Sequence, residues 1–371
     1  MMQAANGEGE KVMLRELLRP IALTGLLILG ACGESPTPII GCEASAGIQP
    51  DCRFQNPEDL AVLPSNQGLL VSQFGGMDGA VAGNLVFYSP RDGRIEVLFP
   101  PTGAIIDDRS WGSAACEPPD AAAFAPHGID LEQRADGRHV LLVVNHGLRE
   151  SVEMLEVLED AAGVTLEWRG CAEGPDQSFF NDVVASRDGG FWVTHMMPKD
   201  AQTSAMLKSA LLGADSGFVY AWNQKRGFTM VAGSNGPFPN GIEKSADESH
   251  LFINMYIAGE VRKLNLATAT VVAVADVASP DNVTWSTDGR LLVASHTDGF
   301  LELMACQGLE QGSCGFAFEI VALDPATMTG VAVVANRGAP MGAATVAVEY
   351  DGELYLGTFA GDRIARTSWN R

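Results

Sequence analysis

Five short segments of the chain have, directly after their first residue, a polar residue of a type that binds metals or transfers protons. The segments are PEDLAV from Pro57, PHGIDL from Pro126, FNDVVA from Phe180, PNGIEK from Pro239 and PDNVTW from Pro280. Their polar residues are Glu58, Asp59, His127, Asn181, Asp182, Asn240, Asp281 and Asn282. Carboxylate and amide oxygens without thiolates are hard ligands, which favour Ca²⁺ over Zn²⁺. The pattern therefore predicts a calcium site, provided that the fold brings these segments together.

An apolar segment follows each polar segment and supplies the second half of a repeat. The six copies are GLLVS at 68–72, HVLLVVN at 139–145, GFWVT at 190–194, HLFIN at 250–254, RLLVAS at 290–295 and ELYLGT at 353–358. Turn residues precede each copy, and Asp-Gly between apolar runs is a strong hairpin signal. The sixth polar segment would be MGAATVA from Met341, which has no ligand-type residue. Six repeats predict an all-β fold, a six-bladed β-propeller with calcium in its central channel.

In a propeller the innermost strands run side by side around the channel, so residues at equivalent positions converge. Taken alone, Asn240 or Asp281 could simply form a turn, because Asn-Gly at 240–241 and Asp-Asn at 281–282 are common in turns. Polar residues at one buried position of five repeats need a shared explanation, since a buried charge without a partner is costly. A bound cation would supply that partner.

The composition agrees with a turn-rich globular fold and excludes some partners. The chain has 371 residues, of which 41 are glycines. Hydrophobic residues make up 46% of the chain and charged residues only 19%. The formal net charge of -22 would repel nucleic acid and anionic lipid, so we expect neither as a binding partner. No G-x-S-x-G, H-E-x-x-H or phosphate-loop motif indicates another kind of site.

The N-terminal region has the order of charges and apolar residues found in export signals. Basic residues precede the apolar run PIALTGLLILGA at 20–31, and Cys32 follows it directly; the basic residues are Lys11, Arg15 and Arg19. The run is short for a membrane-spanning helix. This pattern is typical of a bacterial lipoprotein signal peptide, with an ordinary signal peptide or a membrane anchor as alternatives.

We therefore expect three regions. Residues 1–31 would be a lipoprotein signal peptide, with Met13 as a plausible true start; residues 32–53 would be the lipidated N-terminus and a spacer; residues 54–371 would form the propeller. Acyl chains on Cys32 would tether an exported protein to a membrane of the cell envelope.

The cysteine count is consistent with export. Apart from Cys32 the chain has six cysteines, an even number that permits three disulfides in fifteen pairings: Cys42, Cys52, Cys116, Cys171, Cys306 and Cys314. Cys42 with Cys52 and Cys306 with Cys314 are close enough in sequence to close small loops. The alternative is a set of buried, reduced thiols in a cytosolic protein.

From about residue 56 to 369 the chain resembles the calcium-dependent propellers of the paraoxonase/arylesterase and gluconolactonase/regucalcin group. The resemblance rests on PHGIDL followed by LLVVNHG at 141–147, and on FFNDVVAS, PNGIEKSADESHLFI, PDNVTWSTDGRLLVASH and TVAVEYDGELYLGT. It implies that a catalytic calcium is held by Glu58, Asn181, Asn240, Asp281 and Asn282. It implies that a structural calcium is held by Asp59, Asp182 and the main-chain carbonyl of Ile129. His127 and His146 would form a dyad that handles the proton.

The chain also departs from the arylesterase pattern. It has no cysteine after Cys314, so we expect strand pairing rather than a disulfide to close the ring. Gly147 follows the second histidine, and an apolar stretch, HMMP from His195, stands at a rim position that is usually polar. Residues 199–216 could form an active-site lid or a helix packed on the blade edge.

These residues predict a calcium-dependent hydrolase of lactones or aryl esters. Calcium would polarise the carbonyl of a small-molecule substrate, while His127 activates water and His146 relays the proton. Asp281 is the competing base, and a gluconolactonase-like hydrolase of sugar lactones that uses it is one alternative. A non-catalytic surface-binding propeller stabilised by calcium is another, because a fold does not determine function.

Overall fold

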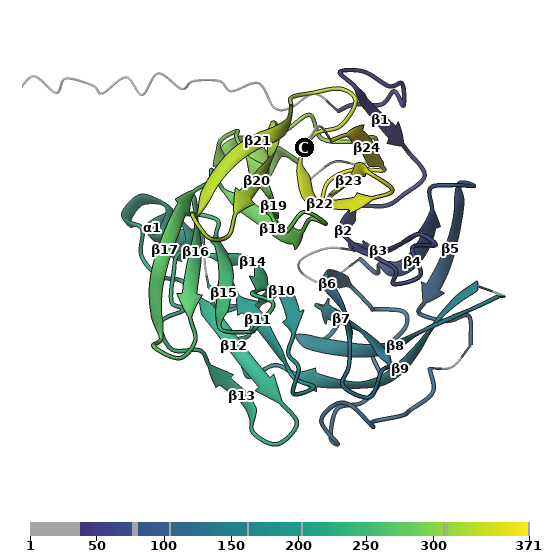
Figure 1. The fold of residues 1–371 in the computed structure, drawn as a ribbon, viewed down its shortest axis with the longest axis vertical. Coiled ribbons are helices and arrows are strands. Elements are labelled where there is room, and N and C mark those ends of the chain that lie inside the picture. Colours follow the sequence, from purple (N-terminus) through teal and green to yellow (C-terminus); the bar gives the residue numbers. More distant parts are fainter. Residues whose placement is uncertain are drawn as a thin grey trace, which may run out of the picture. The chain divides into compact units, whose positions relative to one another are not determined.

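The computed structural model describes residues 38–371, except 76–80, 104, 162, 202, 307–308, 310 and 370–371. The expected signal peptide, Met13 and Cys32 lie outside the described residues. All the described elements belong to one unit, Glu34–Arg371. Within it, six four-stranded antiparallel sheets are arranged around a common centre (Figure 1).

Each of the first five sheets is built from four consecutive strands. The first sheet has β2 (Pro57–Val62), β3 (Leu69–Gln73), β4 (Asn84–Ser89) and β5 (Arg94–Phe99). The second has β6 (Pro126–Gln133), β7 (His139–Asn145), β8 (Ser151–Asp160) and β9 (Gly163–Glu173). The third has β10 (Phe180–Ala185), β11 (Phe191–His195), β12 (Phe218–Asn223) and β13 (Gly227–Met230).

The remaining sheets repeat this plan. The fourth has β14 (Pro239–Lys244), β15 (His250–Met255), β16 (Glu260–Asn265) and β17 (Thr270–Asp276). The fifth has β18 (Pro280–Trp285), β19 (Leu291–His296), β20 (Phe318–Asp324) and β21 (Thr329–Asn336). The sixth has β22 (Ala344–Tyr350), β23 (Glu353–Thr358), β24 (Ile364–Ser368) and, at its outer edge, β1 (Ile48–Asp51). The helices are α1 (Thr203–Leu212) and α2 (Phe300–Cys306).

The predicted six-bladed propeller is confirmed. The polar segments form the innermost strands of the sheets, β2, β6, β10, β14, β18 and β22, which surround the centre in Figure 1. The apolar segments form the second strands, which lie beside them. The alternation of side chains along a strand explains the packing, since each face of a sheet meets a different neighbour. In β3, Leu70 packs with residues of the second sheet, while Leu69 and Val71 pack with the sixth.

Strand pairing closes the ring, as expected. β1 pairs with β24 from Ile48 opposite Thr367 to Asp51 opposite Ile364. The fully buried guanidinium of Arg363 donates hydrogen bonds to the carbonyls of Ile39 (2.9 Å) and Gly41 (2.7 Å). The segment expected to be a spacer therefore contains a strand of the sixth sheet and is attached to the propeller from Ile39 onward.

Three disulfides are formed. Cys42 pairs with Cys52, Cys306 with Cys314, and Cys116 with Cys171. The two short loops indicated by the sequence are thus present, and the third bridge joins residues that are 55 positions apart. Three disulfides are typical of a protein in an oxidising compartment outside the cytoplasm. Within the described ranges, neither helix is long and apolar enough to cross a membrane.

Candidate active site

A bulge at the start of each inner strand positions the polar residues. The register shifts between Pro57 and Asp59 in β2 and between Phe180 and Val183 in β10, and a shift occurs at the same place in β6, β14, β18 and β22. A bulge interrupts regular pairing and redirects side chains, which is why bulges are common beside active sites. The polar residues of the repeat fall within or directly next to these shifts.

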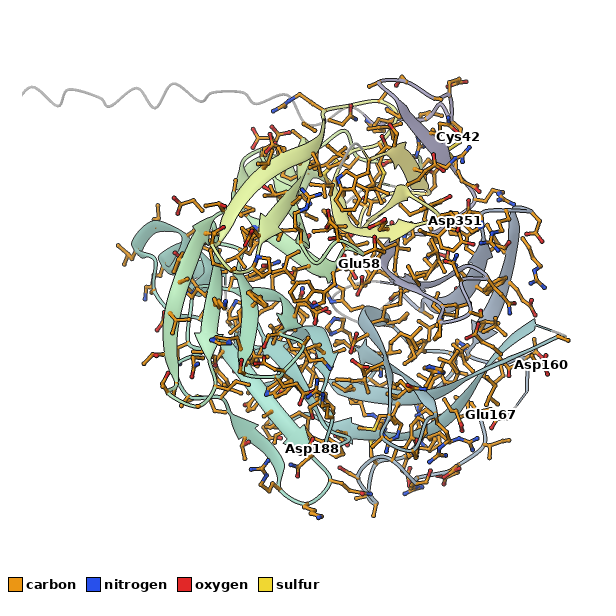
Figure 2. The ribbon with its side chains drawn as sticks, viewed as in Figure 1. Cys42, Glu58, Asp160, Glu167, Asp188 and Asp351 are labelled. Carbon is orange, nitrogen blue, oxygen red and sulfur yellow. A yellow bond between two sulfur atoms is a disulfide. The ribbon has the colours of Figure 1, made fainter. Side chains whose placement is uncertain are left out.

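The bulged residues lie close together in the central channel, where Figure 2 shows Glu58 near the centre of the ring. Asn282 donates a hydrogen bond from Nδ2 to Glu58 Oε1 at 2.8 Å, and His127 Nε2 is 3.6 Å from the same oxygen. Asn240 hydrogen-bonds the Asp281 side chain. Each of the five residues predicted to bind the catalytic calcium is buried: Glu58, Asn181, Asn240, Asp281 and Asn282.

Four of these buried side chains have an oxygen atom without a hydrogen-bond partner. The atoms are Glu58 Oε2, Asn181 Oδ1, Asn240 Oδ1 and Asn282 Oδ1. Buried polar atoms in folded proteins are nearly always paired, so four unpaired oxygens of one kind point to a missing electrophilic partner. Oxygens of carboxylate and amide groups match the ligands of a hard divalent cation such as calcium.

The asparagine oxygens are essential to such a site. Among the described residues, no group of three or more His, Cys, Asp or Glu side chains could hold a metal ion by itself. The ring offers two carboxylates, Glu58 and Asp281, and the other oxygens are neutral amides. The residues present therefore fit a calcium ion only if the amides act as ligands.

Burial of the two carboxylates creates a demand for positive charge. Burial, followed by repulsion from Asp59 and Asp281, raises the pKa of Glu58 well above its ordinary value. Burial also raises the pKa of Asp281 to about 8, although the hydrogen bond with Asn240 opposes this effect. A cation among these groups would stabilise their ionised forms.

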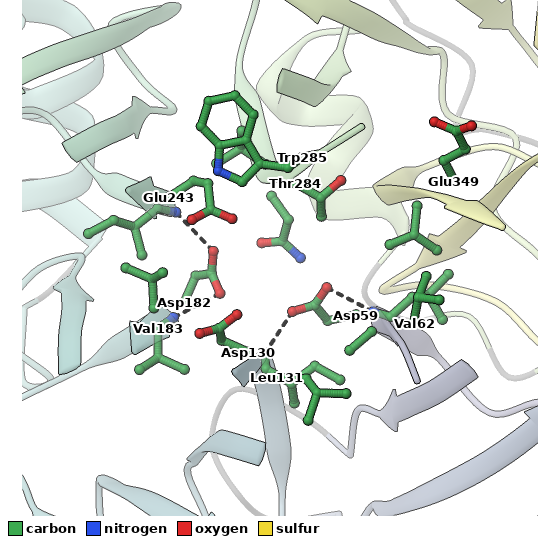
Figure 3. Close-up of a pocket in the computed structure, with 18 residues that line it drawn as sticks. Asp59, Val62, Asp130, Leu131, Asp182, Val183, Glu243, Thr284, Trp285 and Glu349 are labelled. Atoms are coloured by element: carbon green, nitrogen blue, oxygen red, sulfur yellow. Dashed lines mark hydrogen bonds between the residues drawn. The ribbon is translucent and has the colours of Figure 1, made fainter. Parts of the chain in front are cut away.

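The residues predicted for a second calcium lie further along the channel. Asp59 Oδ2 accepts a hydrogen bond from the backbone N–H of Ile129 at 2.7 Å, and Asp182 Oδ2 accepts one from Ile242 at 2.9 Å. Both carboxylates line a cavity of about 180 Å³, together with Asp130 and Glu243 (Figure 3). Unlike the Glu58 ring, each carboxylate of the Asp59 and Asp182 pair has both oxygens occupied by backbone N–H groups. The second ion remains a prediction.

The two histidines of the expected dyad are in direct contact. His127 Nδ1 is 2.9 Å from His146 Nε2, and both side chains are almost fully buried. Phe74 stacks on the His127 ring with a centroid separation of 4.7 Å. Burial, and then the nearby His146, lower the pKa of His127 well below its ordinary value. His127 is therefore neutral near pH 7 and can accept a proton.

Residues 113–363, which include the dyad and most of the calcium ring, match the family model described as arylesterase. The chain belongs to the arylesterase family. No curated protein gives a significant match to it.

Solved structures show where this arylesterase-family fold recurs. A gluconolactonase from Xanthomonas campestris is 18% identical with a TM-score of 0.52, and the match covers 90% of this chain and 95% of that one. A candidate gluconolactonase is 14% identical with a TM-score of 0.50, and the match covers 90% of this chain and 98% of that one. At these identities the likeness establishes the fold alone.

The arylesterase-family protein has a carboxylate at the dyad that the sequence analysis missed. Both oxygens of Glu150 are within hydrogen-bond distance of His146 Nδ1, at 3.0 and 2.9 Å. Lys199 Nζ is 2.7 Å from Glu150 Oε1. The available signal was an acidic residue four positions after His146 in a short connection between two strands.

A further buried histidine of the arylesterase-family protein lies beside Asp281, at the end of β19. His296 has Nε2 at 3.7 Å from Asp281 Oδ2 and at 3.0 Å from the carbonyl oxygen of Ala344. The Tyr256 hydroxyl, which the sequence analysis did not single out, is 2.9 Å from His296 Nδ1. His296 and Tyr256 therefore form a second polar group beside Asp281.

Proposed function

We propose that this protein is a calcium-dependent hydrolase of lactones or aryl esters. The observation that carries the proposal is the set of four unpaired buried oxygens next to a histidine pair, in a chain of the arylesterase family. A calcium-stabilised scaffold that only binds partners would use the unpaired oxygens but would not need the two buried histidines at the channel.

Glu58, Asn181, Asn240, Asp281 and Asn282 would hold the calcium ion. When bound there, calcium would polarise the substrate carbonyl and stabilise the negative charge that develops on its oxygen. The hydrogen bond between Asn282 and Glu58 fixes two of these side chains relative to each other.

His127 would act as the general base. Its Nε2 atom is on the side of the ring that contacts Glu58, and the neutral imidazole can accept a proton from the attacking water. His146 would receive charge through the 2.9 Å contact with His127 Nδ1. General bases of this kind contribute about 10²–10⁴ to the rate.

Aromatic side chains near the histidines favour an apolar substrate. Phe74 stacks on His127, Phe179 lies 5.6 Å from His146, and Phe316 lies 5.1 Å from His296, each distance being between ring centroids. These rings suit the acyl chain of a hydrophobic lactone or the ring of an aryl ester. One observation favours the alternative, a sugar-lactone hydrolase with Asp281 as base, because this buried carboxylate lies among the proposed calcium ligands with Oδ2 3.7 Å from His296 Nε2.

Hydrolysis of a small substrate panel tests the proposal. The panel contains phenyl acetate, a long-chain γ-lactone, an acyl homoserine lactone and gluconolactone, each with calcium and with a chelator. We expect turnover of the apolar substrates that disappears with chelator and falls at least about 100-fold in His127→Gln. His139→Gln, on the partly exposed start of β7, is the control.

Other outcomes of the panel have distinct meanings. Preference for gluconolactone, with loss of activity in Asp281→Asn at retained calcium binding, would favour the sugar-lactone alternative. No turnover by protein that binds calcium and is stabilised by it would favour the binding scaffold.

We also propose that the protein is exported and tethered through acyl chains on Cys32. The three disulfides support an oxidising location. Mass spectrometry of the N-terminal peptide tests the tether, and an unmodified Cys32 in membrane-free protein would contradict it.

A further inference from the structure

Glu150 accepts hydrogen bonds from two groups that can only donate, the ammonium group of Lys199 and the backbone N–H of Phe180. Oε1 accepts from Lys199 Nζ at 2.7 Å, and Oε2 accepts from the backbone N–H of Phe180 at 3.2 Å. Burial alone would raise the pKa of Glu150, but His146 and Lys199 outweigh it and hold the pKa below its ordinary value. Glu150 is therefore an ionised carboxylate, which can only accept hydrogen bonds.

The ionised carboxylate determines which nitrogen atoms of the dyad carry hydrogen. Because Glu150 only accepts, His146 Nδ1 must donate to it. In neutral His146 the other nitrogen, Nε2, then has a lone pair and must accept from His127 Nδ1 across 2.9 Å. His127 Nε2 is left without a hydrogen. These tautomers are assigned from the hydrogen-bond partners.

The resulting lone pair faces the proposed calcium ring. His127 Nε2 lies 3.6 Å from Glu58 Oε1, whereas the hydrogen-bearing nitrogen Nδ1 faces away, toward His146. If the order of donors were reversed, Nε2 would carry a hydrogen and could not accept a proton from water. The direction of the hydrogen bonds from His127 through His146 therefore depends on Glu150, the acceptor at the end of the series.

We propose that Glu150 is a positioning residue that makes His127 Nε2 the proton acceptor of the site, acting through His146. The inference rests on the proposed hydrolase function. Water would give a proton to His127 Nε2 as its oxygen bonds to the carbonyl carbon, and His127 Nδ1 would pass its proton to His146 Nε2. His146 is then a cation against the Glu150 anion. The proton returns by the same route to the leaving oxygen as the ester bond breaks.

Lys199 connects this series of hydrogen bonds to the surface. Its side chain is 39% exposed, and it precedes α1 in the connection between the second and third strands of the third sheet. The ammonium group pairs with Glu150 Oε1, the oxygen that is also 3.0 Å from His146 Nδ1. Positioning of His146 therefore depends on a residue of the segment that the sequence analysis considered as a lid.

The second sheet contains a matched control. Glu153 in β8 is a completely buried glutamate that accepts hydrogen bonds from Ser151 at 2.6 Å and Trp168 at 2.8 Å. It also pairs with Arg149 at 3.1 Å, so it shares with Glu150 a cationic partner and a buried setting. None of its hydrogen bonds in the described structure goes to a histidine. Glu153→Gln therefore reports the cost of losing a buried carboxylate without disturbing the dyad.

The first readout is the tautomer of each histidine, measured by nitrogen NMR on protein with labelled histidines in the presence of calcium. We expect hydrogen on Nδ1 of both His127 and His146, with signals assigned through His127→Gln and His146→Gln. In Glu150→Gln an amide NH₂ must face Lys199, Phe180 or His146, so we expect the His146 tautomer to change or become mixed. Glu153→Gln should leave both tautomers unchanged. Hydrogen on His127 Nε2 in the unsubstituted protein, or an unaltered Glu150→Gln spectrum, would overturn the inference.

The second readout is the split between kcat and KM. We expect Glu150→Gln to lower kcat by about 10²-fold with KM changed by less than about threefold, because the proposed role of Glu150 is in proton transfer and not in substrate binding. Glu150→Asp should recover part of the loss, and Glu153→Gln should stay within about threefold of the unsubstituted protein. Equal losses in Glu150→Gln and Glu153→Gln would indicate a structural role only. If the unsubstituted protein has no activity, the proposed function fails, and the tautomers alone decide the inference.

Discussion

Asn282 donates its side-chain amide to Glu58 Oε1 at 2.8 Å and thereby joins the fifth sheet to the first across the channel. The bond turns Asn282 Oδ1 away from Glu58, and this oxygen and Glu58 Oε2 both remain unpaired. A single contact thus fixes two side chains and leaves one buried oxygen of each without a hydrogen-bond partner. The two unpaired oxygens are therefore available as ligands for a cation.

Glu58→Gln should affect stability in opposite directions with and without calcium. Without the ion, the variant removes a buried carboxyl whose pKa is raised by burial, so unfolding should require as much free energy or more. With calcium, the loss of one ligand charge should weaken binding at least about tenfold and reduce the thermal stabilisation by the ion. Calorimetric titration and thermal unfolding measure both effects. Stabilisation by calcium equal to that of the unsubstituted protein would remove Glu58 from the ligand set.

His195 should make the protein sensitive to mild acid. Burial lowers its pKa to about 4, partly opposed by the charge of Glu150. Since the unfolded chain keeps the ordinary pKa, it binds more protons between about pH 6.5 and 4, and stability falls by up to about 3 kcal/mol as the pH decreases through that range. His195→Gln keeps an acceptor for the Phe179 N–H and should lack this loss. Urea unfolding at several pH values gives the free energy of unfolding as a function of pH for the unsubstituted protein, His195→Gln and the control His139→Gln. Equal slopes for the unsubstituted protein and His195→Gln would contradict the prediction.

The two buried disulfides should contribute unequally to stability. The Cys116–Cys171 bridge closes a separation of 55 residues, and Cys306–Cys314 closes one of 8. On loop entropy alone, replacing the first pair by serines should cost about 4 kcal/mol and replacing the second about 2.5 kcal/mol. All four cysteines are buried, so desolvation is comparable. Chemical unfolding of the two double variants provides the ranking, and the reverse order would show that native-state packing outweighs loop length.

Arg363→Met should detach the N-terminal segment from the propeller. The guanidinium satisfies three carbonyls, those of Ile39, Gly41 and Pro340, and its loss should cost about 3 kcal/mol or more. Arg366→Met in β24 removes largely exposed contacts with Glu353 and Gln49 and should cost less than about 1 kcal/mol. Hydrogen exchange at Ile39 and Gly41 should accelerate in the first variant only. Unchanged exchange there would mean that β1 holds the segment without help.

Repetition determined what could be predicted from the sequence. The two inner strands of each sheet were predictable because turn residues and apolar runs recur, and the contact between Glu58 and Asn282 follows from their equivalent positions. Glu150 lies in a connection outside both series of segments, and its partner Lys199 is 49 residues away in a connection of another sheet. Connections have no periodicity, so neither their ends nor their side-chain contacts can be deduced from the repeat. The same reason explains why Tyr256 and its contact with His296 were missed.

The pairing of β1 with β24 has a consequence for how the molecule can assemble or fail. Because the sixth sheet takes strands from both ends of the propeller sequence, no shorter continuous fragment can contain all six complete sheets. A chain released before β24 is made would leave β1 unpaired and expose the apolar faces of two neighbouring blades together. We expect the ring to form in one cooperative event, late in synthesis, and premature chains to be substrates for degradation rather than partly active enzymes.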